Sequence, residues 1–308
     1  MSKPFLTYQQ QIDKLVNEKK LLISDRTFAE NALKQIGYFS LIGGYKRPFI
    51  NPTTRIYESN TQFEDIYALY TFDKELRELV FKYLCEIEQR IRQLTSYAFC
   101  SIHGESQIAY LDPGSYKIGK AQPDELKKLI DTLDFHANRD TEHAYLVHQR
   151  KVHKNVPLWV LMNTLTFGQL SHFYSFLPFK IQSAVSKEFD YINEHELEIY
   201  LSALTWFRNI CAHNERLYSF RLGRLDFPDK PLHKNLNISK KGSQYLNGKK
   251  DLFGLIIAMK YLLPEDSFAQ LNDALKHLIH KYTKQSSRIN KDKILSIMGF
   301  PPDWEKIA

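Results

Sequence analysis

The sequence predicts an all-α protein, on three observations. Apolar side chains recur with a helical period over most of the chain, and the longest such run extends from Ile66 to about Cys100. Helix-start signals precede several runs, as in the capping box Thr61-Gln62-Phe63-Glu64. The glycine-rich fingerprints with which many α/β proteins bind nucleotides do not occur. We therefore expect a central helical bundle with a helical N-terminal lobe and a helical C-terminal extension.

The composition is that of a folded protein with an excess of positive charge. Of 308 residues, 43% are hydrophobic and 25% are charged, and the net charge of +7 suits a polyanionic partner such as RNA. Cys85, Cys100 and Cys211 are too scattered for a disulfide framework or a zinc site, which suits a reducing compartment. No signal peptide is visible, and the most apolar run, Leu252 to Leu263, contains Lys260 and is too short to span a bilayer. We expect a cytoplasmic protein that binds no membrane.

Residues 7 to 35 predict two helices joined by a short turn. Ile12 lies on the apolar face of the first, and Ser24 or Asp25 can cap the second. Gly43-Gly44 is then expected to break the helical pattern. A short join also suits a helix-turn-helix that reads DNA, but the second helix has few base-reading side chains. We therefore expect two packed helices.

About five helices are expected between residues 61 and 220, enough for a four-helix bundle with one extra element. Residues 136 to 153 of this region hold four histidines. Two of them, His143 and His148, are five residues apart, and no Cys or carboxylate completes a ligand set beside them. We therefore expect no metal site and no cofactor. The four histidines are His136, His143, His148 and His153.

The last of these helices ends within the stretch from Thr205 to Tyr218. Asn193 is its predicted N-cap, and Glu196 follows three residues later, as in a capping box. An apolar and a polar stripe then lie on opposite sides. Arg208 fits neither stripe, because it lies at the edge of the apolar face, where a guanidinium needs a partner or an anion. The apolar stripe is Leu197, Tyr200, Leu201, Leu204, Phe207 and Cys211, and the polar stripe is Glu198, Ser202, Thr205, Asn209 and His213.

Arg208 and His213 offer the chemistry of RNA cleavage. Histidine can take a proton from a 2′-hydroxyl or give one to the leaving 5′-oxygen, while arginine holds the phosphate and its transition-state charge. Asn209, one turn before His213, can fix the imidazole or contact the phosphate. Arg208 and His213 diverge by about 140° around one helix, so a shared pocket needs two such helices across a two-fold axis. We therefore expect a homodimer.

A second pair at the same spacing is Arg92 and Tyr97, with tyrosine where histidine would stand. It is either a degenerate copy of the motif or part of an ion-pair network. Glu and Arg at neighbouring helical positions commonly pair on exposed faces, so we expect the surface ion-pair network.

Three stretches resemble the motifs of a known family. Phe207-Arg208-Asn209-Ile210-Cys211-Ala212-His213-Asn214-Glu215-Arg216-Leu217 resembles the signature of the Abi-like family of abortive-infection proteins, of the AbiD/AbiF type. Ile36 to Tyr45 resembles its N-terminal motif. Pro157-Leu158-Trp159 together with Thr166 to Ser171 resembles its middle motif. The resemblance runs from about Tyr8 to Tyr218, with the motifs in the expected order.

This resemblance implies a fold and an activity. The family is assigned to the HEPN group of helical proteins, many of which are metal-independent ribonucleases, so the bundle should be HEPN-like. By the same resemblance Arg208 and His213 would be catalytic, with Asn209 as the polar residue after the arginine. Some HEPN toxins carry a Tyr two residues after the His. That position is Glu215 here, so regulation through such a Tyr is not carried over.

The chain changes character after Tyr218. Residues 221 to 250 show little periodicity and an excess of basic side chains, which could guide an RNA backbone. A solvated lysine-rich loop would account for the charge equally well. Helices are expected again at residues 250–263, at 267–282 and near Ile294. The candidate RNA-binding residues are Arg216, Arg221, Arg224, Lys240, Lys241, Lys249 and Lys250.

We therefore expect an N-terminal lobe at residues 1–60, a HEPN-like core at 61–225, and a basic loop with C-terminal helices at 226–308. The first functional hypothesis is a metal-independent endoribonuclease that acts as an abortive-infection or toxin effector in phage defence. RNA would be its substrate, and a small non-coding RNA would hold it inactive. The second hypothesis is an RNA-binding protein without turnover, which would not need the Arg208/His213 pair. The third is a DNA-binding regulator, which would need a recognition helix.

Overall fold

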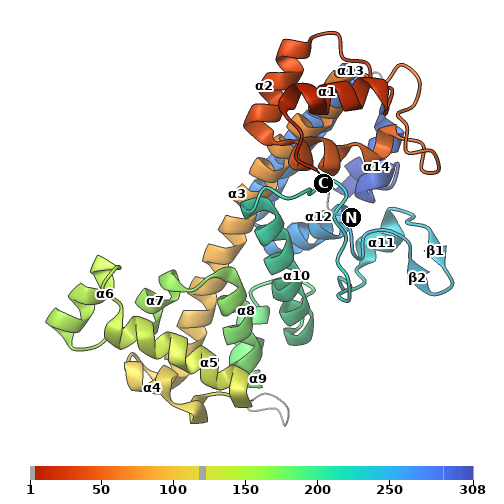
Figure 1. Cartoon of the computed structure of the whole chain (residues 1–308). Coiled ribbons are helices and arrows are strands. Elements are labelled where there is room, and N and C mark those ends of the chain that lie inside the picture. The colour runs from red at the N-terminus through yellow and green to blue at the C-terminus, as the bar shows by residue number, and fades with distance from the viewer. Residues whose placement is uncertain (1–3, 118–122, 287, 308) are drawn as a thin grey trace.

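The structure is a computed structural model that describes residues 4–117, 123–286 and 288–307. Within these residues the protein is all-α, as predicted, and its one sheet is a hairpin of two-residue strands (Figure 1). No helix in the described part of the chain is long and apolar enough to cross a membrane.

The α-helices are α1 (Tyr8–Asn17), α2 (Arg26–Ile36), α3 (Phe63–His103), α4 (Gln107–Leu111), α5 (Pro123–Asp134), α6 (Ala144–His148), α7 (Leu158–Leu161), α8 (Phe167–Phe176), α9 (Phe179–Ser186), α10 (Glu194–Ala212), α11 (Pro231–Asn235), α12 (Leu252–Leu262), α13 (Glu265–Gln285) and α14 (Lys291–Met298). The strands are β1 (Lys240–Lys241) and β2 (Gln244–Tyr245), and the π- and 3₁₀-turns are η1 (Phe39–Gly43), η2 (Arg47–Phe49), η3 (Pro113–Ser115), η4 (Phe135–Arg139), η5 (Gln149–His153), η6 (Met162–Thr164) and η7 (Trp304–Ile307).

Helix α3 is the axis of the molecule. It has 41 residues and runs from the N-terminal lobe, where α1, α2 and α13 lie, to the far end formed by α4 to α9 (Figure 1). The long helix predicted from residue 61 is thus confirmed, but its capping box is one residue later than expected, at Gln62 and Asp65. The shift arises because the Thr61 hydroxyl turns back and donates to the carbonyl of Glu58 at 2.7 Å.

The two predicted N-terminal helices are present as α1 and α2. Asp25 caps α2 by accepting a hydrogen bond from the backbone N–H of Phe28 at 2.8 Å. The Phe28 ring then packs edge to face on Tyr67 of α3, at 4.9 Å between ring centres. The expected break at Gly43-Gly44 is wrong, because Gly44 keeps right-handed helical angles and the chain stays helical to Tyr45. This lobe is therefore packed onto α3 as a unit.

The most apolar run of the sequence forms α12, which lies in the core. Its residues from Leu252 to Met259 are all buried. Gly254 is required there by close approach, since a Cβ atom at this position would lie 2.6 Å from the Phe227 ring and 2.8 Å from the Gly248 carbonyl oxygen. The short, fully apolar run is thus a buried helix packed against the segment that follows α10.

A fully buried carboxylate joins three distant parts of the chain. Asp73 of α3 accepts hydrogen bonds from the Tyr45 hydroxyl at 2.8 Å and from Arg77 at 2.7 Å. It also accepts from the backbone N–H groups of Leu217 and Tyr218, at 3.1 and 2.7 Å. The N-terminal lobe, α3 and the segment after α10 therefore meet on one charged group.

The two partners of Asp73 complete this network. Arg77, which is 3% exposed, also donates to the Tyr45 hydroxyl at 3.0 Å and to the Glu215 carbonyl at 3.2 Å. Burial, and next to it the charge of Asp73, raises the pKa of Tyr45, so the phenol remains a donor at any physiological pH. We call Tyr45, Asp73 and Arg77 the buried network. It fixes the backbone that directly follows His213.

The buried network predicts a large effect of Asp73→Asn on stability. An amide cannot replace the charge that Arg77 needs, and breaking a buried pair typically costs about 3–5 kcal/mol. Tyr45→Phe removes two hydrogen bonds to charged groups, with Asp73 and with Arg77, and should cost about 1.5–3 kcal/mol for each. Urea unfolding followed by circular dichroism measures both.

The matched control is Glu75→Gln, on the same helix. Glu75 pairs with Lys281 at 2.8 Å, and both side chains are partly exposed, so this change should cost only about 0–1 kcal/mol. If Asp73→Asn cost no more than Glu75→Gln, the buried network would not carry the structural role assigned to it.

Candidate functional site

Helix α10 is built as the sequence predicted. The Asn193 side chain accepts from the backbone N–H of Glu196 at 2.9 Å, and the Glu196 carboxylate accepts from that of Asn193 at 3.1 Å. All six residues of the predicted apolar stripe are buried. The helix ends at Ala212, and His213 is its C-cap. The motif thus occupies the last turns of a well-capped helix and the turn after it.

Arg208 finds its partner on α3. Its Nε lies 3.8 Å from Oε2 of Glu88, and its guanidinium carbon lies 5.7 Å from the centre of the Phe81 ring. The Nε–H group makes no hydrogen bond to any described residue, and the side chain is 29% exposed. Charge and ring contact thus hold the guanidinium at the edge of the apolar face, with its Nε atom buried and part of the side chain open to solvent.

Glu88 is shared by two arginines. Its other oxygen accepts from Arg92, which also donates to the Leu165 carbonyl at 2.6 Å. The Glu88 side chain is 6% exposed, so one buried carboxylate faces two guanidinium groups and one positive charge is left over. A surplus positive charge in a partly desolvated setting favours an anion such as a phosphodiester.

The structure corrects the expected setting of Arg92. The predicted ion pair is present, but it is not on an exposed surface, because α10 and the residues before α8 cover this face of α3. Tyr97 is 78% exposed. Spacing along α3 predicts the pair, whereas its burial depends on helices far along the chain.

Asn209 lies in a cleft between α8 and α10. The cleft has a volume of about 780 Å³. Gly168 of the middle motif lies at the contact of α8 with α10, where a Cβ atom would make an ordinary van der Waals contact with Cγ2 of Thr205 at 3.5 Å. Four residues of the polar stripe of α10 therefore face the cleft. They are Glu198, Ser202, Thr205 and Asn209. The lining residues are Lys117, Glu125, Gly168, Ser171, His172, Ser175, Phe176, Glu198, Ser202, Thr205, Trp206 and Asn209.

His172 is a cleft residue that the sequence reasoning missed. It is exposed on α8 and lines the cleft together with Asn209. The available signal was its place directly after Ser171, where the middle motif ends. Lys117 gave no comparable signal, because it reaches the cleft from a loop far from either motif.

His213 is exposed at the end of α10. Its backbone N–H donates to the Asn209 carbonyl at 2.9 Å, and Asn214 then adopts a left-handed conformation with φ of 55°. This turn sends the chain toward the buried network at Leu217 and Tyr218. The imidazole is therefore presented to solvent by a segment that is anchored a few residues later.

The three predicted catalytic residues have different surroundings within one chain. Arg208 lies against α3, Asn209 lines the cleft beside α8, and His213 caps the helix. No hydrogen bond or ion pair joins their side chains to one another among the described residues. The angle of about 140° between Arg208 and His213 was inferred from ideal helix geometry. His213 is the C-cap of α10, and its backbone angles are no longer helical.

The Cys85 thiol lies within electrostatic reach of Arg208, Arg92 and Glu88. Burial, with a further contribution from Glu88, raises the pKa of the Cys85 thiol, and Arg208 and Arg92 oppose this only in part. The thiol therefore remains protonated near neutral pH. Thiolate chemistry is not favoured at this site.

Four of the seven candidate RNA-binding residues have local partners. Arg216 donates to the Gly44 carbonyl at 2.8 Å, and Arg221 lies 3.4 Å from Asp251. Lys250 pairs with Asp226 at 3.1 Å, and Lys249 pairs with Asp229. The charges of Arg221, Lys249 and Lys250 are therefore partly neutralised by carboxylates, whereas Arg216 keeps its full charge.

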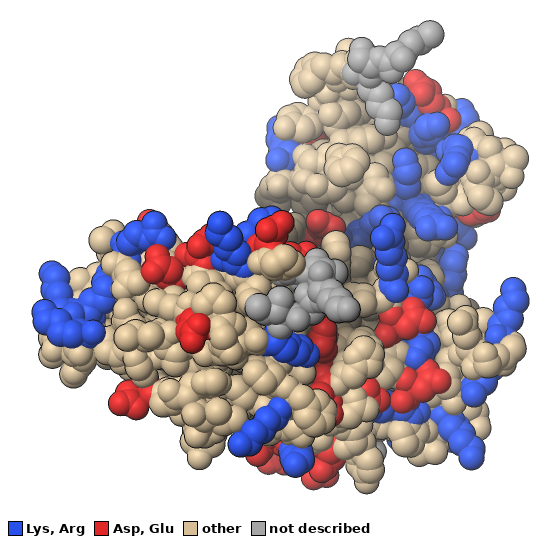
Figure 2. Space-filling view, turned by 90° about the horizontal axis from the view of Figure 1, so that it is seen from below, with Lys and Arg blue, Asp and Glu red and all other residues tan. Residues whose placement is uncertain are grey.

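The other three, Arg224, Lys240 and Lys241, are exposed and form no ion pair with any residue in the described ranges. Lys240 lies above the Tyr245 ring at 4.2 Å. Figure 2 shows basic side chains along the edge of the molecule on the side where Figure 1 places the hairpin. The hairpin thus carries the least compensated part of the predicted basic segment.

Comparison with known proteins bears on this arrangement. Residues 31–219 match the family model described as Abi-like protein. No curated protein and no solved structure gives a match. The matched residues cover more than half of the chain, from α2 through the whole of α10 to the backbone held by Asp73. The chain therefore belongs to the Abi-like family.

Proposed function

We propose that this protein is a metal-independent endoribonuclease of the HEPN type that acts as an abortive-infection or toxin effector in phage defence. Membership of the Abi-like family supports the role in phage defence. The main support for the chemistry is the setting of Arg208. Its guanidinium is partly exposed and lies beside the Glu88 carboxylate, which also pairs with Arg92. His213 stands at the exposed end of the same helix.

In the proposed reaction Arg208 binds the scissile phosphate. The 2′-oxygen attacks phosphorus and the bond to the 5′-oxygen breaks, giving a 2′,3′-cyclic phosphate and a 5′-hydroxyl. The His213 imidazole takes the 2′ proton, and the imidazolium so formed gives a proton to the leaving 5′-oxygen. Glu88 orients Arg208 and is a positioning residue in this scheme, because it touches the guanidinium and not the RNA.

The cleft beside Asn209 suits single-stranded RNA. Trp206 lines it and is 57% exposed, which offers a ring face on which an unpaired base can stack. Lys117 lines the same cleft and can meet a phosphate. Bases would then lie against α10 while the backbone passes Arg208.

A second candidate function is RNA binding without turnover. It is favoured by the absence of contact between the Arg208, Asn209 and His213 side chains within one described chain. The same surface would then hold a regulatory RNA that it does not cut. Cleavage assays separate the two functions, because only the nuclease leaves cyclic phosphate ends.

The first test is cleavage of mixed RNA in EDTA. We expect 2′,3′-cyclic phosphate ends and resistance of RNA blocked at the 2′ position. His213→Ala should reduce the cleavage rate by about 10²–10⁴, the usual contribution of an acid–base group. Arg208→Ala should abolish detectable cleavage. Gel analysis of end-labelled RNA measures these rates.

Matched controls for this test are His195→Ala, an exposed histidine in the first turn of α10, and Arg26→Ala, an exposed arginine at the start of α2. Both should cut at the normal rate. Strict dependence on Mg²⁺, or cutting of DNA, would refute the proposed chemistry and leave RNA binding as the function.

The second test concerns a shared site. Since Arg208 and His213 diverge, a complete pocket would combine two copies of α10 in a two-fold dimer. If Arg from one protomer acts with His from the other, mixing the Arg208→Ala and His213→Ala proteins should restore one competent site in some heterodimers. Light scattering at the lowest active concentration should give the mass of a dimer. A fully active monomer would rule out the shared site.

The third test uses the salt dependence of RNA binding. Each lost phosphate contact should lower the slope of log K against log salt by about 0.7 for single strands. Lys240→Ala/Lys241→Ala should therefore reduce the slope by about 1.4. Lys249→Ala/Lys250→Ala should change it less, because Asp229 and Asp226 already neutralise these lysines. Equal slopes in all three proteins would assign the hairpin to a solvated surface without RNA contacts.

A further inference from the structure

We propose that His136, Asp140 and His143 form a binding site for a divalent transition-metal ion of the zinc class. The three residues lie where α5 gives way to the π-turn η4 and α6 begins. Asp140 is the C-cap of η4 and His143 is the N-cap of α6. Side chains from two helical elements therefore converge on one carboxylate.

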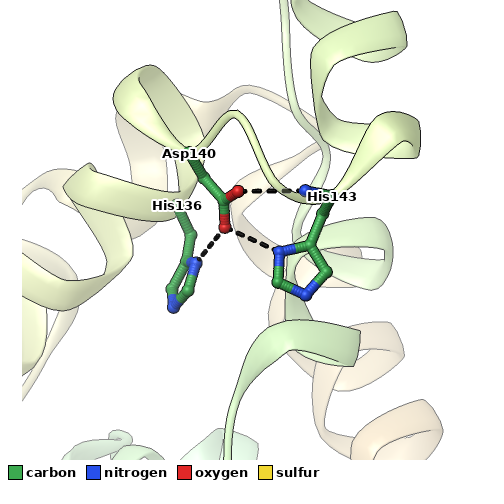
Figure 3. A group of neighbouring side chains, drawn as sticks. All are labelled: His136, Asp140 and His143. Carbon is green, nitrogen blue, oxygen red and sulfur yellow. Dashed lines mark hydrogen bonds and ion pairs between the residues drawn. The ribbon is translucent and has the colours of Figure 1, made fainter.

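The donor atoms are grouped closely. Oδ2 of Asp140 lies 2.7 Å from Nδ1 of His136 and 2.8 Å from Nδ1 of His143. One ligand atom from each residue can be chosen so that all three lie within 4.8 Å of one another. Figure 3 shows both imidazoles on the same side of the carboxylate. Three protein donors with a fourth position for water match the open sites that zinc occupies in proteins.

The donor types select the class of ion. Two imidazole nitrogens and one carboxylate oxygen suit Zn²⁺ and its neighbours in the first transition row. Ca²⁺ and Mg²⁺ prefer sites made of oxygen alone, so two histidines disfavour them.

The site is held in place by its own backbone. The other oxygen of Asp140 accepts from the N–H groups of Glu142 and His143, at 2.9 and 3.1 Å. Arg150 donates to the carbonyl of His136 at 3.1 Å and also to that of Asp140. A segment clamped in this way loses little conformational freedom when it binds an ion.

An ion can reach the donors from solvent. The Asp140 side chain is 3% exposed, whereas those of His136 and His143 are 15% and 37% exposed. The ion would replace the two N–H protons that now face Asp140. Each neutral ring would then carry its proton on Nε2, exchanged through water, and nothing is oxidised or reduced.

The site overturns a premise drawn from the sequence. The expectation of no metal rested on His143 and His148 and on the lack of a carboxylate beside them. In the structure His148 pairs with His153, at 5.8 Å between ring centres. His143 turns instead to Asp140, which supplies the carboxylate. The spacing of His136, Asp140 and His143, which are four and three residues apart, was the signal in the sequence that could have shown this.

This inference is independent of the proposed nuclease. Arg208 and His213 belong to α10, and the three ligands belong to the α5–α6 junction. An ion there would brace that junction and take no part in the RNA chemistry. The test of this inference therefore measures metal binding and does not depend on RNA cleavage.

The experiment uses the full chain, stripped with a chelator and dialysed. Titration calorimetry with Zn²⁺ should give one equivalent per chain, and Co²⁺ should give the visible absorption bands of a nitrogen- and oxygen-liganded ion. His136→Ala/His143→Ala should weaken Zn²⁺ binding by more than the roughly 10–100-fold that follows loss of an outer-shell partner. Asp140→Asn, which keeps the side-chain shape, should also weaken binding.

The matched control is His148→Ala/His153→Ala, a neighbouring pair of exposed histidines. It should bind Zn²⁺ as the wild type does. Failure of the wild type to bind one equivalent, or loss of binding in the control and not in His136→Ala/His143→Ala, would overturn the proposal. The amount of Zn²⁺ that the wild type binds already tests the proposal, so the test does not depend on whether a variant folds.

Discussion

The rest of the structure depends on the ionic contact between Asp73 and Arg77. An unpaired charge at this depth would be very costly, so each of the two residues requires the other. Asp73 also accepts from Tyr45 and from two backbone N–H groups after α10. The N-terminal family motif and the end of the signature motif thus meet in one contact in space, although they lie far apart along the chain. That contact positions His213 and leaves its imidazole exposed.

The sequence was informative wherever the deciding interactions are local. The N-cap at Asn193, the apolar stripe of α10 and the need of Arg208 for a partner all follow from neighbouring residues and were confirmed. The identity of that partner did not follow. Glu88 lies on another helix, and its burial depends on how α10 and the segment at Leu165 cover α3.

The same limit explains what was missed. His172 and Lys117 share a cleft with Asn209 only because α8 packs on α10. Asp140 meets His136 and His143 because the chain leaves a π-turn with extended backbone angles. The spacing of these three residues, four and three apart, is that of one helical face, but it does not reveal the turn at Asp140, which depends on side-chain and carbonyl contacts such as those of Arg150.

Helix α3 connects the buried network at Asp73 with the Arg208 contact at Glu88, and this constrains the number of residues between them. Asp73 and Glu88 are fifteen residues apart on it, which is about 22 Å along the axis. Deleting or inserting one residue between them would rotate one site against the other by about 100° and shift it by about 1.5 Å. Either Tyr45 or Arg208 would then lose its partner. Substitutions on the exposed face of this segment are therefore tolerable in evolution, but a change in the number of its residues is not.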